Sequence, residues 1–272
     1  MKHLNFKTVT LIFFLLLLAF NLIRWFGGPS SDGFTGYFYQ HSWLFYGPLF
    51  ATYLIVPVIF SFFPCSRFHS RNVICKAETP ENHVSLTFDD GPDPVRTPRI
   101  LDILKTQNVQ AAFFLTGKQI PGNEALVVRI FREGHVIGNH SYTHSNGWDF
   151  KLPTAMRRDI LVTEKLIEQI IQRKTGFFRP PYGVINPMVE AAIQTTHYKM
   201  IGWSKRSLDT CIRDEEKLLH RIAGNLGKGD IILLHDTQEI TVNMLEKLIL
   251  TIRHKGFQLV SPEQLLKTHP YV

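Results

Sequence analysis

The chain has 272 residues, of which 44% are hydrophobic and 19% are charged, enough for one domain of ordinary size plus a further segment. This composition excludes a disordered chain, and three cysteines are too few for a disulfide scaffold. The formal charge of +7 is uneven, because the first 76 residues carry six of the 30 Lys and Arg residues but only one of the 23 acids. It therefore does not indicate a nucleic-acid-binding groove, which needs cations gathered on a folded face.

Two chargeless apolar runs open the chain. The first, from Thr8 to Ile23, is extended by residues that can anchor at a membrane surface, so we expect a helix over about residues 8–26. A cleaved signal peptide is the alternative, but no small-x-small cleavage site follows the run. The second run predicts a spanning helix over about residues 42–64, kinked by Pro48 and Pro57. A buried core helix of a soluble domain is the alternative, although such a helix is rarely apolar on every face.

The two runs predict a membrane hairpin over residues 1–76 with membrane lipid as its partner, followed by a soluble domain over residues 77–272. Basic residues flank the open end of the hairpin: Lys2, Lys7, Arg67, Arg71 and Lys76. The positive-inside rule therefore predicts a two-span protein of the cell membrane whose large domain is cytoplasmic. The odd number of cysteines also fits a reducing compartment slightly better. A bridge between Cys65 and Cys75 stays open if that stretch is exported.

The large domain alternates β-rich runs with helical patterns. The expected strands are His83–Phe88, Gln110–Leu115, His135–Asn139, Gly176–Phe178, Tyr198–Trp203, Asp230–Leu234 and Phe257–Val260. The expected helices are Thr97–Thr106, Asn123–Glu133, Thr154–Arg173, Asn186–Thr195, Asp214–Leu226 and Val242–His254. Such alternation indicates a parallel sheet built from βαβ units. The fold class is α/β, as a distorted (β/α) barrel of about seven strands, with a doubly wound open sheet as the alternative.

Unusual polar residues follow the carboxyl ends of these strands: Asp89 and Asp90, His140, Arg179, Asp209 and His235. In a parallel barrel those ends share one face, where side chains distant in sequence can meet. Each residue alone also has a structural explanation, such as an Asx turn for the acids or a satisfied core histidine. Their common placement favours a functional site.

Three groups of these residues suggest chemistry. Two histidines four apart, His140 and His144, can share a metal ion, and an Asp from another strand end completes a three-ligand site with open positions. Zn²⁺ is the expected ion, with Co²⁺, Ni²⁺ or Mn²⁺ as alternatives. Arg179 precedes two prolines that fix the backbone and could pair with a carboxylate. His235 ends an apolar strand and could act as an acid or a base near neutral pH.

Together these residues resemble the motifs of the polysaccharide deacetylase family, carbohydrate esterase family four, over about residues 80–265. The resemblance implies a metal-dependent hydrolase with Asp89 as general base, His235 as general acid, Asp209 as the acid that tunes it, and Arg179 as the residue that orients the base. It implies Asp90, His140 and His144 as metal ligands. It also implies that the backbone N–H of Tyr182 stabilises the oxyanion, and it assigns the substrate pocket to Ile232, Leu234 and Thr210.

Two positions depart from the family pattern. Thr210 stands where the family usually has Trp lining the acetyl pocket, so another aromatic such as Trp148 could close that pocket. Ile232 stands where the family usually has Leu. These departures concern the acyl group and the substrate, and they leave the hydrolytic residues intact.

The resemblance implies removal of N-acetyl groups from N-acetylhexosamine residues of a glycan, such as peptidoglycan, poly-N-acetylglucosamine or a chitin-like oligomer. A deacetylase or deformylase of a lipid-linked sugar precursor is the alternative at a membrane. Two further readings are a non-catalytic membrane protein that binds glycan and a metal hydrolase acting on a non-sugar amide.

Overall fold

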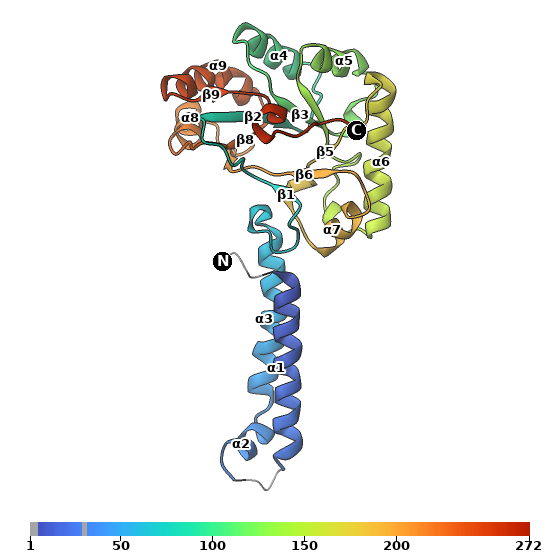
Figure 1. Cartoon of the computed structure of the whole chain (residues 1–272), viewed down its shortest axis with the longest axis vertical. Helices are drawn as coiled ribbons and strands as arrows, with labels where there is room; N and C mark the ends of the chain where they lie inside the picture. The colour runs from blue at the N-terminus through green and yellow to red at the C-terminus, as the bar shows by residue number, and fades with distance from the viewer. Residues whose placement is uncertain (1–4, 29–31) are drawn as a thin grey trace.

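The computed structural model describes residues 5–28 and 32–272, so Lys2 lies outside the described residues. A helical hairpin projects from a curled α/β domain, and the chain ends in that domain (Figure 1). The hairpin consists of α1 (Phe6–Phe26) and α3 (Trp43–Ser61), joined at its far end by the short helix α2 (Phe34–Gln40). The sequence predicted both long helices and missed α2.

The two long helices have the length and composition needed to cross a membrane, and only 6% of each apolar segment is buried. A core helix of a soluble domain would be mostly buried, so that alternative does not describe α3. The helices contact each other through aromatic side chains, with the rings of Phe13 and Tyr53 stacked at a centroid distance of 4.1 Å. Pro48 and Pro57 both lie within α3.

The α/β domain contains a curled sheet in which every strand pair is parallel, in the order β1-β6-β5-β4-β3-β2-β8-β7, with β9 paired to β2. The strands are β1 (Val73–Ile74), β2 (His83–Asp89), β3 (Ala112–Leu115), β4 (Val136–Asn139), β5 (Phe177–Phe178), β6 (Lys199–Ile201), β7 (Lys205–Arg206), β8 (Ile231–His235) and β9 (Gln258–Leu259). The seven expected strands and the barrel-like curl are confirmed. The short strands β1 and β7 were missed.

Helices cover the outer face of the sheet. They are α4 (Arg96–Thr106), α5 (Glu124–Arg132), α6 (Pro153–Ile171), α7 (Pro187–Ile193), α8 (Glu215–Ala223) and α9 (Glu239–His254). A further helix, α10 (Pro262–Leu266), instead packs its Leu265 with Phe114 and Phe177 inside the curl. The short 3-10 turns are η1 (Pro64–Ser66), η2 (Gly117–Gln119), η3 (Trp148–Phe150) and η4 (Pro181–Gly183). The large core lies between α4, α5, α8, α9 and the sheet, while a smaller apolar cluster that includes Phe114, Phe177 and Ile231 fills the inside of the curl. Strand side chains alternate between these two cores because the side-chain period of a strand is two.

The sheet begins before residue 77, the predicted start of the domain. β1 pairs with β6, and Val73 and Cys75 are buried in the domain core. The segment that follows the hairpin is thus part of the sheet edge, and a fragment starting at residue 77 would lack an edge strand.

Candidate active site

The carboxyl ends of β2 and β8 place Asp89 and His235 side by side. The two residues are register partners on neighbouring parallel strands. Asp89 is 3% exposed, and its Oδ1 accepts a 2.6 Å hydrogen bond from Nη1 of Arg179. Burial raises the pKa of Asp89 above its ordinary value, although the charge of Arg179 opposes that rise. The other oxygen, Oδ2, lies 3.8 Å from Nε2 of His140, so it faces the histidine pair.

Arg179 is fully buried, and its side chain is fixed by hydrogen bonds to residues of two strands, β2 and the end of β6. Its Nε donates to Ile201 O and its Nη2 donates to Gly202 O, both at 2.9 Å, while Nη1 also donates to Thr87 Oγ1. The guanidinium lies over the ring of Phe114, 4.0 Å from its centroid. A buried cation is stable only when it is paired and hydrogen-bonded. Here Nη1 pairs with Asp89, while Nε and Nη2 bond backbone carbonyls that fix the guanidinium in place.

Asp90, His140 and His144 form a candidate metal centre. Their ligand atoms all lie within 4.8 Å of one another. Asp90 Oδ1 is 3.5 Å from His140 Nε2 and 3.4 Å from His144 Nε2. These separations are long for hydrogen bonds. They match the roughly 3.3 Å between two ligand atoms that each lie about 2.0–2.1 Å from a tetrahedral ion.

The tautomer of His140 also suits a metal ligand. Its Nδ1 lies 2.7 Å from the carbonyl oxygen of Arg179, which can only accept, so Nδ1 carries the proton and Nε2 keeps its lone pair. Burial, reinforced by the nearby His144, lowers the pKa of His140 to about 3. The ring is therefore neutral at physiological pH, which is the form that binds a metal.

The loop after β4, not a helix, brings the two histidines together. Ser141 and His144 have φ values of 66° and 44°, in the left-handed region. One carboxylate oxygen of Asp159, on α6, accepts hydrogen bonds from the backbone N–H of Tyr142 at 2.9 Å and of Thr143 at 3.3 Å. Asp159 therefore positions this loop, residues 140–144, which carries both histidines and is called the ligand loop below. Sequence reasoning missed it, because nothing in the spacing of a helical Asp marks such a contact.

His235 is held by a buried carboxylate. Its Nδ1 is 2.7 Å from Asp209 Oδ1, and its backbone N–H donates to Asp209 Oδ2 at 2.7 Å. Thr241 Oγ1 and Ser207 Oγ donate to the two oxygens of the same carboxylate. Burial alone would lower the pKa of His235, but the hydrogen bond and charge of Asp209 outweigh it and raise that pKa to about 9. The imidazole is thus protonated at neutral pH, with Nε2 left to donate.

Asp236 is a second buried carboxyl that sequence reasoning missed. Its Oδ2 accepts a 2.6 Å hydrogen bond from Thr97 Oγ1, and burial raises its pKa to about 7. A Cβ at Gly91 would lie 2.0 Å from Asp236 Oδ2, so glycine is required where the turn after Asp90 passes this carboxyl. Nothing in the sequence indicated that Asp236 is a buried carboxyl with a separate role from the adjacent His235.

Tyr182 lies at the mouth of the site. Its side chain is 46% exposed, and its hydroxyl donates to Asn146 Oδ1 at 3.0 Å beside the ring of His144. Its φ of 59° is in the left-handed region. The next residue, Gly183, packs against the indole of Trp203, where a Cβ would lie 2.1 Å from the ring.

Two of the residues predicted to form the substrate pocket do not gather around these groups. Ile232 and Leu234 are fully buried in the core beneath the helices, on the opposite face of β8 from His235. The two-residue strand period explains this, and it places Leu233 on the His235 face instead. Thr210 is exposed.

Trp148 does not close the pocket in place of the missing aromatic. Its side chain is fully buried, and its Nε1 donates to Asp159 Oδ2 at 2.8 Å. The indole therefore belongs to the support of the ligand loop. Trp203 does lie near the site, with its ring 5.7 Å from Cζ of Arg179.

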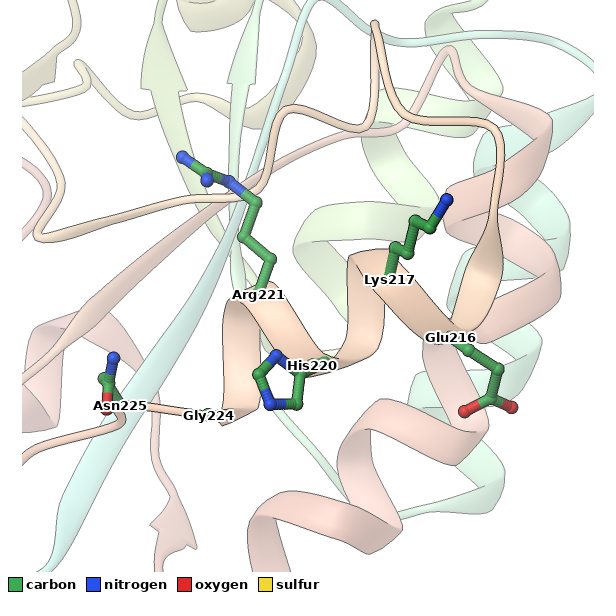
Figure 2. A pocket seen from close by; sticks show the side chains of 6 residues that line it. All are labelled: Glu216, Lys217, His220, Arg221, Gly224 and Asn225. Atoms are coloured by element: carbon green, nitrogen blue, oxygen red, sulfur yellow. The ribbon is translucent and has the colours of Figure 1, made fainter.

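A cavity of about 630 Å³ lies along α8, away from the residues described above. Figure 2 shows the residues that line it: Glu216, Lys217, His220, Arg221, Gly224 and Asn225. None of the predicted site residues is among them, so this cavity is separate from the candidate active site.

A curled parallel sheet that holds a buried carboxylate, a carboxylate-bound imidazole and an Asp-His-His cluster at the carboxyl ends of its strands defines a (β/α)-barrel hydrolase. A model of the polysaccharide deacetylase family matches residues 76–201. The chain is 35% identical over 200 residues to a peptidoglycan-N-acetylglucosamine deacetylase of Bacillus cereus, covering 70% of this chain and 92% of that protein. It belongs to the polysaccharide deacetylase family, carbohydrate esterase family four, and is a hydrolase of carbon–nitrogen amide bonds.

Two further relatives agree with this assignment. The peptidoglycan-N-acetylmuramic acid deacetylase PdaC of Bacillus subtilis is 31% identical over 182 residues, which cover 67% of this chain and 38% of that protein. The crystal structure of the Bc1960 peptidoglycan N-acetylglucosamine deacetylase superposes with a TM-score of 0.68 at 33% identity, covering 73% of this chain and 94% of that one. The shared fold confirms the curled barrel expected from the sequence.

Proposed function

We propose that the protein removes N-acetyl groups from N-acetylhexosamine residues of a cell-wall glycan, with peptidoglycan as the favoured polymer. The observation that carries this proposal is the placement of Asp89 and His235 on adjacent strands beside the Asp90-His140-His144 cluster. The names of the relatives support the choice of polymer, since two of them act on N-acetylated sugars of peptidoglycan.

The three-residue cluster fits a divalent cation by its donor set, its spacing and the neutral His140. Zn²⁺ is the proposed ion. When bound, such a cation supplies a Lewis acid that makes water nucleophilic at neutral pH and polarises the amide oxygen. Asp90, His140 and His144 would hold it.

Asp89 is proposed as the general base. Arg179 binds its Oδ1, so Oδ2 is the oxygen that faces the cluster and can take the proton of the attacking water. His235 is proposed as the general acid, because its Nδ1 is engaged by Asp209 and its raised pKa keeps a proton on Nε2. That proton passes to the amide nitrogen as the C–N bond breaks, and acetate and a free amino sugar result. The backbone N–H of Tyr182 is the proposed oxyanion donor.

We propose that residues 1–76 anchor the enzyme and that its catalytic domain faces an oxidising compartment. The charge count around the hairpin favours the cytoplasm, whereas Cys65 and Cys75 form a disulfide. The disulfide has the greater weight, because disulfides persist in exported proteins and are rare in the cytosol, while the charge rule here depends on a few residues. An external site also agrees with a wall glycan as substrate.

The test is acetate release from N-acetylglucosamine oligomers by the full chain in detergent, loaded with Zn²⁺. We expect turnover that a chelator abolishes and that Asp89→Asn reduces by at least about a thousandfold, since a general base contributes about 10²–10⁴ and the variant also loses a charge beside the cluster. Asp102→Asn is the matched control, because Asp102 is an exposed carboxylate on α4. Release that persists in Asp89→Asn would contradict the assignment of the base.

A further inference from the structure

The end of the second membrane helix contacts the loops that carry the active site. The carbonyl oxygen of Ser61, the last residue of α3, accepts a 3.0 Å hydrogen bond from the backbone N–H of Ile185, in the loop after β5. Cys65 Sγ lies 3.1 Å from the carbonyl oxygen of Trp203, in the loop after β6. These are the loops that carry Tyr182 and contact Arg179.

The connection between the hairpin and the domain is short and crosslinked. Only residues 62–72 separate α3 from β1, and the Cys65–Cys75 disulfide bridges this segment to the residue after β1. The backbone N–H of Phe6 donates to Phe68 O at 2.9 Å, which fastens the start of α1 to the same segment. The catalytic domain is therefore held at the membrane surface, where α1 and α3 leave the bilayer.

A cavity of about 600 Å³ lies at this junction, within the range of about 300–1,000 Å³ typical of small-molecule sites. Its walls include Ile59, Phe62 and Phe63, at the end of the membrane helix, and Trp203. The three residues from the hairpin are 50–62% exposed in the absence of a membrane. The pocket is thus continuous with the surface that the bilayer covers.

Trp203 is a wall shared by this cavity and the active site. Its ring packs against Gly183 and lies 5.7 Å from Cζ of Arg179, which binds the proposed base directly. Arg206 also lines the cavity, and its exposed side chain forms no ion pair within residues 5–28 and 32–272. The cavity thus combines apolar walls with an unpaired cation, and Trp203 connects it to the residue that holds the buried carboxylate.

We infer that this cavity binds the apolar chain of a lipid-linked saccharide, whose phosphate or pyrophosphate pairs with Arg206 and whose N-acetylated sugar enters the active site. Such a molecule carries an apolar chain, an anion and a sugar. The protein offers an apolar cavity, a cation that lines it, and catalytic groups next to the shared wall of Trp203. The inference rests on the proposed function, because it uses the same catalytic centre and names the form in which the sugar arrives. An active site that is held at the bilayer surface lies where a membrane-borne sugar is located, whereas most of the wall polymer lies farther away.

The test compares two substrates of the full chain in nanodiscs. One is N-acetylglucosamine on a polyprenyl pyrophosphate, and the other is a soluble N-acetylglucosamine oligomer, with acetate release as the readout. We expect kcat/KM at least tenfold higher for the lipid-linked sugar. Phe63→Asp and Arg206→Glu should each reduce the ratio of the two values at least tenfold. Phe26→Asp, at the far end of the hairpin and 80% exposed, should leave the ratio unchanged.

A photoreactive polyprenyl pyrophosphate sugar provides a readout that does not depend on turnover. We expect crosslinks within residues 59–66 or 203–206, lost in Phe63→Asp. Turnover of the soluble oligomer with neither turnover nor crosslinking of the lipid-linked sugar would overturn the inference and leave the proposed function in place. Crosslinking at the pocket with no acetate from either substrate would support the pocket and contradict the proposed reaction.

Discussion

Replacing Asp209 with Asn should change the pH dependence of the enzyme more than its maximal activity. Asp209 supplies the hydrogen bond and the main charge that raise the pKa of His235 to about 9. Without that charge, burial lowers the pKa while Asp89 and Asp90 still raise it, so we expect the pKa of His235 to fall from about 9 toward the ordinary value of 6.5. Asn keeps the size of the side chain and one acceptor oxygen.

The magnitude follows from the fraction of His235 that carries a proton. At pH 8 this fraction is about 90% for a pKa near 9 and about 3% for a pKa near 6.5, a loss of about thirtyfold in active enzyme. At pH 6 the two fractions differ by only about 1.3-fold. The raised pKa favours the acid form of His235 at and below neutral pH, so on the basic side the wild type should lose activity as the pH rises through about 9.

The assay is kcat/KM for acetate release from pH 5.5 to 9.5 at saturating Zn²⁺, for wild type, Asp209→Asn and the control Asp102→Asn. We expect the basic limb of the profile to move down by about two to three pH units in Asp209→Asn alone. A profile parallel to that of the wild type, with the same loss at pH 6 and pH 8, would refute the role of Asp209 in tuning His235. Circular dichroism across the same range separates this effect from unfolding.

Three further predictions address the metal cluster, the site loop and the compartment. His144→Ala should weaken Zn²⁺ binding, measured by equilibrium dialysis, by more than the 10–100-fold that loss of a supporting partner typically costs, and unchanged affinity would exclude His144 as a ligand. Gly183→Ala should lower stability by about 1–3 kcal/mol and reduce kcat, because its Cβ would meet Trp203. Gly122→Ala, with a positive φ but open space, is its control, and equal losses in both variants would exclude the contact. Unreduced protein from cells should take one maleimide label, at Cys211, whereas three labels would contradict an oxidising compartment.

The sequence predicted which polar residues belong to the candidate site more completely than it predicted how those residues are arranged in space. The ends of strands can be predicted from the sequence, because an apolar run that stops at Asp89, His140 or His235 indicates a buried strand and the point at which that strand ends. The distance between those ends depends on strand order, which is set by packing across the whole sheet. β8 lies next to β2 although more than 140 residues separate Asp89 from His235 in the chain, and only this pairing makes them neighbours.

The expectations that failed share a physical origin. Ile232 and Leu234 were assigned to the substrate pocket by motif position, but the two-residue period of β8 turns both toward the helices. Trp148 was a candidate for the pocket because it is aromatic, and its burial against Asp159 depends on how α6 packs. The short strands β1 and β7 escaped detection because two residues carry no periodic signal.

The sequence by itself determined the apolar hairpin, the alternating α/β order and the identity of the charged and imidazole groups, since these depend on composition and local periodicity. Tertiary structure alone decided that Arg179 is buried beneath Asp89, that His140 presents Nε2 to the cluster, and that the end of α3 contacts the catalytic loops. Each of these is a contact between groups far apart in the chain. Its energy comes from burial and hydrogen bonding that exist only once the sheet has curled and the hairpin has packed against it.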